Sequence, residues 1–184
     1  VRTAAVAALR AVGAEPPAAA EPGPRPPDRT VDWDALRALG RHPLLVLATP
    51  RGTIVLRLDA EQAPLTTQTI TGLAREGRYD GVPFHRVVPN FVIQGGDFAR
   101  RDGFGGPGFE IRSEFTRIPY RQGTLGMASA GKDTEGSQFF VTHSLQPHLD
   151  GAYTAFGVVV SGQDAVDAIL EGEPILSASV RPGR

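Results

Sequence analysis

Cysteine is absent from this chain of 184 residues, which excludes disulfide bonds and thiolate chemistry but leaves the redox compartment open. Lys132 is the only lysine, and the formal net charge of −1 gives no reason to expect a nucleic acid or an anionic membrane as a partner. No apolar run approaches the roughly 18 residues that a membrane-spanning helix needs. The composition therefore predicts a soluble globular protein, with one domain and some extra sequence.

The N-terminal part of the sequence differs in composition from the rest. Because the chain begins at Val1 rather than Met, we interpret it as a fragment or a processed product, and its first ten residues show no signal peptide. Apolar residues at helical spacing predict a short amphipathic helix over residues 1–13. It is either a tail packed on the main domain or the end of an upstream helical-repeat region, since it resembles the last helix of a HEAT-type repeat. Residues 14–30 are rich in Pro and Ala, which favours a semi-rigid linker over a ligand for a proline-binding pocket.

The remaining residues, 31–184, are expected to form one domain that begins with a short helix over 32–39. Asp32 is placed to cap this helix, and Trp33, Leu36 and Leu39 share a face that we expect to pack against the domain. Two further helices are predicted over 63–76 and 163–170, the second with Val166, Ile169 and Leu170 directed inward.

Short β-type segments separated by turn signals make up most of the domain. They are expected over residues 44–49, 53–58, 84–88, 91–93, 124–129, 137–142, 154–160 and 175–180. Hairpin connections dominate and no alternating βαβ pattern is present, which favours a mainly β, antiparallel fold.

The stretch from Pro83 to Phe98 places unusual polar residues within predicted strands. Arg86 and Gln94 stand among β-branched and aromatic residues, where such polar groups are rare unless they are paired or face a cavity. The stretch therefore predicts two strands that present a guanidinium and an amide beside apolar side chains.

This stretch, from Phe84 as FHRVVPNFVIQGGDF, resembles the signature of the cyclophilin-type peptidyl-prolyl isomerases. Two further blocks resemble the same family in the same order: Gly123–Gly131 with Gly136–Val141, and Pro147–Gly151 with Phe156-Gly157. The resemblance covers roughly residues 42–183. It implies a closed eight-stranded antiparallel barrel capped by two α-helices, and an isomerase that uses no cofactor and no metal and acts on X–Pro bonds in peptides and unfolded chains, assisting protein folding.

The resemblance also assigns site residues. It implies that Arg86 is the catalytic arginine and that Gln94 orients it and contacts substrate. The implied substrate-binding residues are Phe91, Val92, Ala128, Ser129, Gln138, Phe140, His148, Leu149 and Tyr153. His148 stands where eukaryotic members commonly have Trp, and Tyr153 stands at a common His, which looks like the bacterial pattern. The expected compartment is a bacterial cytoplasm or periplasm, and the missing indole makes tight cyclosporin binding doubtful.

Other functions have weaker support in the sequence. Gly103–Gly108 satisfies G-x-G-x-x-G, but Pro107 and an alternating segment follow it instead of a helix, so we interpret it as a surface loop. The four histidines show no zinc-binding spacing, and no G-x-S-x-G elbow is present. The alternative that remains is a module that binds proline-containing segments without significant turnover.

Overall fold

The computed structural model describes residues 30–183. The expected helix over 1–13 and nearly all of the expected linker over 14–30 lie outside these residues. The described helices are α2 (Trp33–Leu39), α3 (Pro64–Arg75) and α4 (Gln163–Ala168), with the short 3-10 turn η1 (Pro147–Leu149). The strands are β1 (Leu44–Thr49), β2 (Gly52–Leu58), β3 (Arg86–Val88), β4 (Val92–Gly95), β5 (Thr124–Met127), β6 (Phe139–Thr142), β7 (Ala155–Ser161) and β8 (Ser177–Arg181).

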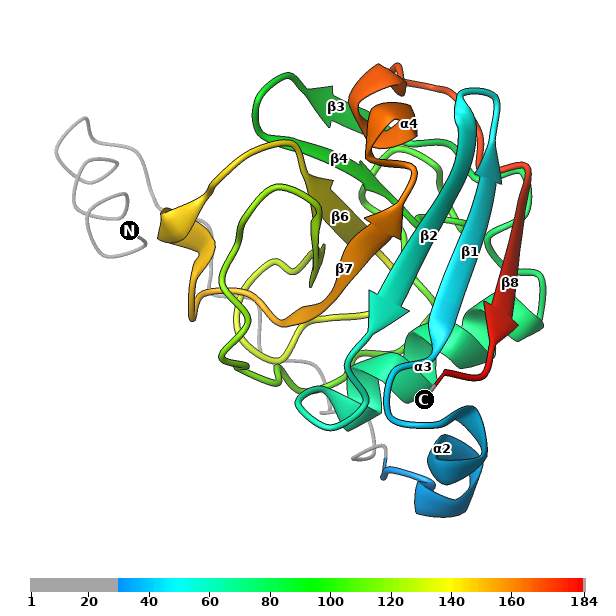
Figure 1. The fold of residues 1–184 in the computed structure, drawn as a ribbon, viewed down its shortest axis with the longest axis vertical. Coiled ribbons are helices and arrows are strands. Elements are labelled where there is room, and N and C mark those ends of the chain that lie inside the picture. The colour runs from blue at the N-terminus through cyan, green and yellow to red at the C-terminus, as the bar shows by residue number, and fades with distance from the viewer. Residues whose placement is uncertain (1–29, 184) are drawn as a thin grey trace, which may run out of the picture.

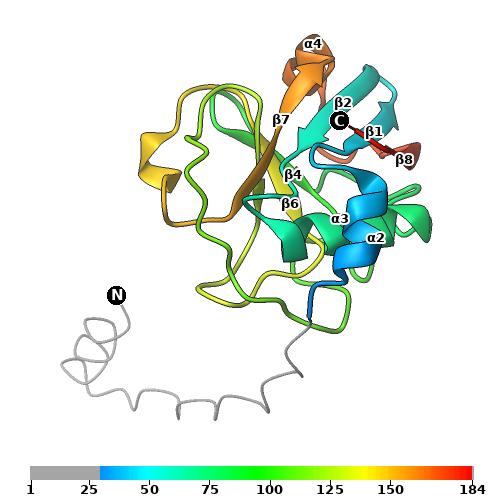
Figure 2. The same cartoon turned by 60° about the horizontal axis from the view of Figure 1, so that its bottom comes forward.

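All eight strands belong to one antiparallel sheet in the order β3-β4-β6-β5-β7-β2-β1-β8. The sheet curls strongly, and α3 and α4 lie at the two opposite open ends of the curl (Figures 1 and 2). The mainly β, antiparallel architecture predicted from the sequence is thus confirmed. The strand ladder leaves β3 and β8 at its ends, so it does not by itself confirm the expected closed barrel.

The core lies inside the curl of the sheet and follows the two-residue period of its strands. Leu45 and Leu47 of β1 are fully buried, while the residues beside them are only partly buried. Leu65, Ile70 and Leu73 of α3 are also buried. This apolar interior is what holds the strands that carry the site, since burial of apolar surface is the main favourable term in folding.

The cap and the packing of the short helix α2 agree only in part with those predicted from the sequence. Asp32 accepts hydrogen bonds from the N–H groups of Asp34 and Ala35 at 3.1 and 3.0 Å, which confirms the predicted cap. Leu36 and Leu39 are buried against Ala60, with Val31 and Val180 alongside. The prediction that Trp33 packs on the domain is wrong, because its side chain is 55% exposed and Val31 completes the cluster instead.

The end of α4 gives a second correction. Val166 and Ile169 are buried as expected, but Leu170 is exposed because the helix ends at Ala168 and the backbone at Ile169 is extended instead of helical. Among residues 30–183, no helix has the length and apolar character that crossing a lipid bilayer requires.

Two glycines in regular elements are predicted to respond oppositely to alanine. A Cβ at Gly126 in β5 would lie 2.3 Å from the Tyr120 hydroxyl oxygen and 2.6 Å from Phe140 Cζ, whereas one at Gly72 in α3 would have no neighbour within 4 Å. Gly126→Ala should therefore lower the free energy of unfolding by about 1–3 kcal/mol through overpacking. Gly72→Ala should raise it by about 0.5–1 kcal/mol, because it restricts the unfolded chain. Denaturant unfolding of both variants tests the pair, and equal effects would contradict this account of the packing.

Candidate active site

The strand register of β3 and β4 places the two predicted polar residues opposite each other. Arg86 pairs with Gln94 across the antiparallel ladder, and the Arg86 guanidinium donates a hydrogen bond from Nη1 to Gln94 Oε1 at 3.1 Å. The Arg86 guanidinium carbon also lies 5.5 Å from the centre of the Phe91 ring. The β3–β4 hairpin therefore brings a cation, an amide and an aromatic ring to one point on the sheet.

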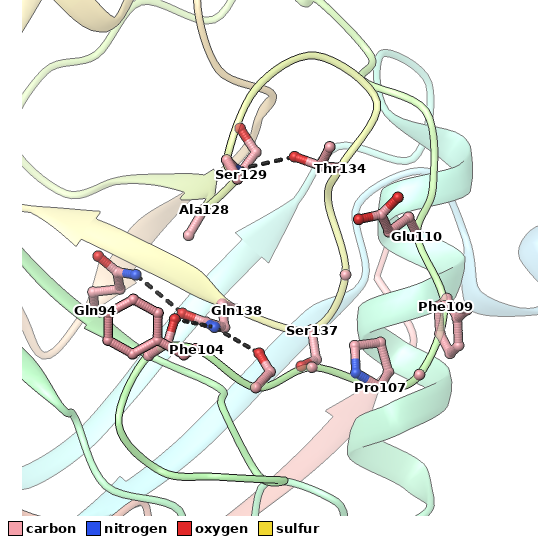
Figure 3. A pocket seen from close by; sticks show the side chains of 16 residues that line it. Gln94, Phe104, Pro107, Phe109, Glu110, Ala128, Ser129, Thr134, Ser137 and Gln138 are labelled. Atoms are coloured by element: carbon pink, nitrogen blue, oxygen red, sulfur yellow. Dashed lines mark hydrogen bonds between the residues drawn. The ribbon is translucent and has the colours of Figure 1, made fainter. Parts of the chain in front are cut away.

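Gln94 is in turn held by a second glutamine. Its Nε2 donates to Gln138 Oε1 at 3.1 Å, and Gln138 Nε2 donates to the carbonyl oxygens of Gly103 and Gly105 at 2.9 and 2.8 Å (Figure 3). Because the Gln138 amide nitrogen is committed to two carbonyls, its oxygen faces Gln94. This fixes the orientation of the Gln94 amide, so an oxygen and not an N–H faces Arg86.

The loop that supplies those carbonyls is built around one buried carboxylate. Asp97 has no solvent-exposed surface, and its oxygens accept hydrogen bonds from the backbone N–H groups of Ala99, Arg100, Asp102, Gly103 and Gly105 at 2.9–3.2 Å. Burial alone would raise the pKa of Asp97, but these N–H donors outweigh it and lower the pKa to about 2. The loop 97–105 is thereby fixed against Gln138.

Arg86 and Gln94 face a cavity of about 480 Å³. Its lining contains every site residue predicted from the sequence except Gln138, which lies behind Gln94 and lines a neighbouring cavity. The apolar part comes from Phe91, Val92, Phe140 and Leu149, the last of them on η1. The structure thus brings together side chains from three separate stretches of the chain.

Stacked and edge-on aromatic contacts hold the walls of this cavity. Phe91 stacks on His148 at 5.7 Å between ring centres, and Phe140 meets Tyr153 edge-on at 5.9 Å. Behind Phe140 the ring of Tyr120 stacks at 5.6 Å. Sequence reasoning missed Tyr120, because nothing in its local pattern distinguishes it from a loop residue, and it also missed Asp97, although an aspartate ahead of a glycine-rich loop is a known turn signal.

A second, larger cavity of about 730 Å³ adjoins the first and shares Gln94, Ala128 and Ser129 with it (Figure 3). Its walls are the loop segments 103–110 and 128–138. The G-x-G-x-x-G segment therefore lies in the wall of a cavity, in turns and irregular backbone rather than at the start of a helix. This confirms the loop interpretation of Gly103–Gly108. Among residues 30–183, no three His, Cys, Asp or Glu side chains are grouped so as to hold a metal ion.

Comparison with known proteins decides the family of the chain. Residues 44–181 match the family model described as cyclophilin type peptidyl-prolyl cis-trans isomerase/CLD. The chain belongs to this family. A peptidyl-prolyl cis-trans isomerase of Synechococcus elongatus is 43% identical over 73% of this chain and 94% of its own length. Peptidyl-prolyl cis-trans isomerase B of Bacillus subtilis is 48% identical over 65% of this chain and 85% of its own length.

Solved structures give the same family. A cyclophilin type peptidyl-prolyl cis-trans isomerase of Cryptosporidium parvum superposes with a TM-score of 0.68 at 29% identity, and the match covers 78% of this chain and 98% of that chain. A second structure of the Cryptosporidium parvum protein, obtained in the presence of the dipeptide Ala-Pro, superposes with a TM-score of 0.67. The predicted activity is confirmed: this cyclophilin-type protein is a peptidyl-prolyl cis-trans isomerase that accelerates rotation about X–Pro peptide bonds.

The buried Asp97 predicts a pH-dependent stability. In the folded state the pKa of Asp97 lies below the ordinary aspartate value. Its contribution to the free energy of unfolding is therefore complete above about pH 4 and is lost as the pH falls towards 2. The shift from 3.8 to about 2 corresponds to roughly 2 kcal/mol. Asp97→Asn should lower the free energy of unfolding by about that amount at pH 7, with the difference from wild type closing between pH 4 and 2. The exposed Glu171→Gln is the control, and a difference that is constant with pH would contradict the assignment.

Proposed function

We propose that Arg86 accelerates the isomerisation by stabilising the twisted amide. Rotation about a peptide bond is slow because its partial double bond imposes a barrier of about 18–20 kcal/mol. In the twisted state the prolyl nitrogen regains its lone pair and accepts a hydrogen bond, which the planar ground state does not offer. A guanidinium aimed at that nitrogen therefore binds the transition state more tightly than the substrate. The observation that carries this proposal is that Arg86 is held by Gln94 at the wall of a cavity whose other walls include apolar side chains.

The apolar part of this cavity is the proposed binding site for the proline ring. Val92, Phe140 and Leu149 are buried and form one cluster, with Phe91 and Tyr153 packed against it. A ring held between these side chains stays still while the carbonyl side of the bond turns. The rotation breaks no bond and moves no proton, so the site needs no general acid or base. A cavity lining with one arginine and no carboxylate fits this requirement.

The substrate backbone is proposed to lie along Ala128 and Ser129, which both cavities share. The Ala128 N–H already donates to the Gln138 carbonyl oxygen at 3.0 Å. The Ala128 carbonyl and the Ser129 backbone are therefore the groups that we assign to the peptide. In this arrangement Gln94 orients Arg86 and touches substrate, and Gln138 acts through Gln94 as a positioning residue.

The proposed substrates are proline-containing peptides and unfolded chains. Slow X–Pro isomerisation limits folding, so assistance to protein folding follows from the activity. The bacterial origin of the relatives, together with His148 and Tyr153, supports a place in a bacterial cytoplasm or periplasm.

We also propose two finer features of the architecture. Residues 31–184 form one domain that includes α2, as the packing of Leu36 and Leu39 on Ala60 supports. The sheet closes into a barrel through the segments that precede β3 and β8, and not through those strands themselves. Main-chain bonds join residues 81–84 to residues 172–175, including Phe84 N–H to the Glu173 carbonyl at 2.9 Å and Ile175 N–H to the Val82 carbonyl at 2.8 Å.

Arg86→Ala tests the catalytic assignment. Loss of a donor that acts in the transition state should lower kcat/KM for a short X–Pro peptide by about a hundredfold or more, with the fold intact. Arg57→Ala is the matched control, since Arg57 is an exposed strand arginine on β2, outside the cavity lining. Full activity in Arg86→Ala would refute the mechanism. Peptide binding without turnover in the wild type would favour the binding-module alternative.

His148→Trp tests the expected weakness of cyclosporin binding. His148 stacks on Phe91 at the cavity wall, so a tryptophan at this position adds a larger face and an indole N–H donor beside the same ring. One added hydrogen bond and the added contact should tighten cyclosporin binding by roughly tenfold or more in calorimetry. Tight binding by the wild type, unaffected by the substitution, would be the contrary result.

A further inference from the structure

Glu135 is a buried carboxyl group to which the isomerisation mechanism assigns no part. Its residue is 1% exposed, yet it lies between Thr134 and Gly136, which both line the larger cavity (Figure 3 shows Thr134). A buried glutamate without a cationic partner is uncommon and calls for a physical account.

Only one of the two Glu135 carboxyl oxygens has a hydrogen-bond partner in the described structure. The Thr154 hydroxyl accepts from the Glu114 N–H at 2.8 Å and donates to Glu135 Oε1 at 2.7 Å. Glu135 Oε2 is buried and has no hydrogen-bond partner in the described structure. Because the threonine proton goes to Oε1, the carboxyl proton, when present, sits on Oε2.

The groups that face Glu135 add negative charge rather than positive. The segment 111–114 brings the Glu114 carboxylate, which caps the start of α3 by accepting from the Leu65 and Thr66 N–H groups. The Tyr120 hydroxyl is also near and has no hydrogen-bond partner among residues 30–183, and Asp150 and Tyr153 add to the negative charge around it.

Within its own loop Glu135 has no compensating cation. Lys132 is exposed and lies 3.9 Å from Asp133. Burial raises the pKa of Glu135 to about 7, and the Glu114 charge adds to this, while the Thr154 hydroxyl that donates to Oε1 and the nearby Ser113 hydroxyl oppose it.

The backbone around Glu135 connects it to the substrate groove, by which we mean the proposed substrate path along Ala128 and Ser129 that the two cavities share. Its carbonyl oxygen accepts from the Ile111 N–H at 2.8 Å, and Asp133 and Ser113 exchange two hydrogen bonds at 3.0 Å. The Thr154 carbonyl oxygen accepts from the N–H of Met127, the residue before Ala128, at 2.9 Å. Thr154 also directly follows Tyr153, which lines the smaller cavity. A charge appearing on Glu135 therefore acts on both ends of the groove.

We propose that Glu135, held as a neutral carboxylic acid, is a positioning residue for the substrate-binding segment 128–138. Ionisation places an unpartnered charge on Oε2 beside the Glu114 carboxylate. The hydrogen bonds between the segment 128–138 and residues 111–114 then weaken, and water reaches the charged carboxylate. The proposal rests on the proposed path of the substrate along Ala128 and Ser129. Substrate binding closes the groove over the neutral form, so binding weakens as the pH rises through the neutral range.

The sign of the effect follows from linkage. Below about pH 6 the folded protein holds Glu135 protonated and the groove is ordered; above about pH 8 most molecules carry the charge. The dissociation constant of an X–Pro peptide should rise by about threefold to tenfold between these values, with a smaller change in kcat.

The experiment follows the Glu135 carboxyl carbon by NMR titration and measures peptide binding and turnover at pH 6 and pH 8. Wild type is compared with Glu135→Gln, Glu135→Ala and, as a control, the exposed Glu171→Gln. Glutamine keeps the acceptor for Thr154 and never ionises, so Glu135→Gln should bind at pH 8 about as tightly as wild type does at pH 6. Alanine loses the anchor and should bind weakly at both.

Two results would overturn the proposal. One is a Glu135 carboxyl that titrates in the ordinary glutamate range; this measurement on the wild type stands even where a variant does not fold. The other is a Glu135→Gln variant whose binding keeps the wild-type pH dependence, which would assign that dependence to another group. Absence of turnover with normal, pH-dependent binding would instead count against the proposed function of Arg86 and leave the role of Glu135 supported.

Discussion

The relay Arg86–Gln94–Gln138 is the interaction on which the site depends. Each amide in it can be placed in only one orientation, because the carbonyls of Gly103 and Gly105 take both protons that Gln138 offers. The constraint passes along the chain of hydrogen bonds and ends with an oxygen facing the guanidinium. The Arg86 guanidinium is thereby held in place although residues 30–183 offer it no ion pair with a carboxylate, and its charge stays available to the substrate.

Two buried acids secure the loops around this relay by opposite means. Asp97 is surrounded by backbone N–H groups, which stabilise its charge and lower its pKa. Glu135 has one hydroxyl donor and a neighbouring carboxylate, and its pKa is raised. Both lie beneath walls of the same cavity, so the loop 97–105 is fixed by a permanent anion and the segment 128–138 by a group whose charge depends on pH.

The sequence predicted the elements and the site residues whose signals are local or carried by a family motif. The strand pattern gave the antiparallel sheet, and the Arg86 and Gln94 block led to the family. The features that the sequence did not predict depend on tertiary contacts. Tyr120, for example, stacks behind Phe140 from a loop with no distinctive sequence pattern. Trp33 was expected in the core from its helical spacing, but Val31, outside the helix, takes that place. Likewise, the roles of Asp97 and Glu135 follow from which donors surround each carboxylate, and these come from residues far along the chain.

The central claim is that a proline ring sits in the smaller cavity with its nitrogen directed at Arg86. A crystal structure of the protein with a short X–Pro peptide tests it most directly. The account predicts a ring between Phe91, Phe140 and Leu149, the prolyl nitrogen within reach of the Arg86 guanidinium, and the peptide backbone along Ala128 and Ser129. A proline seated in the larger cavity, or one whose nitrogen points away from Arg86, would contradict it.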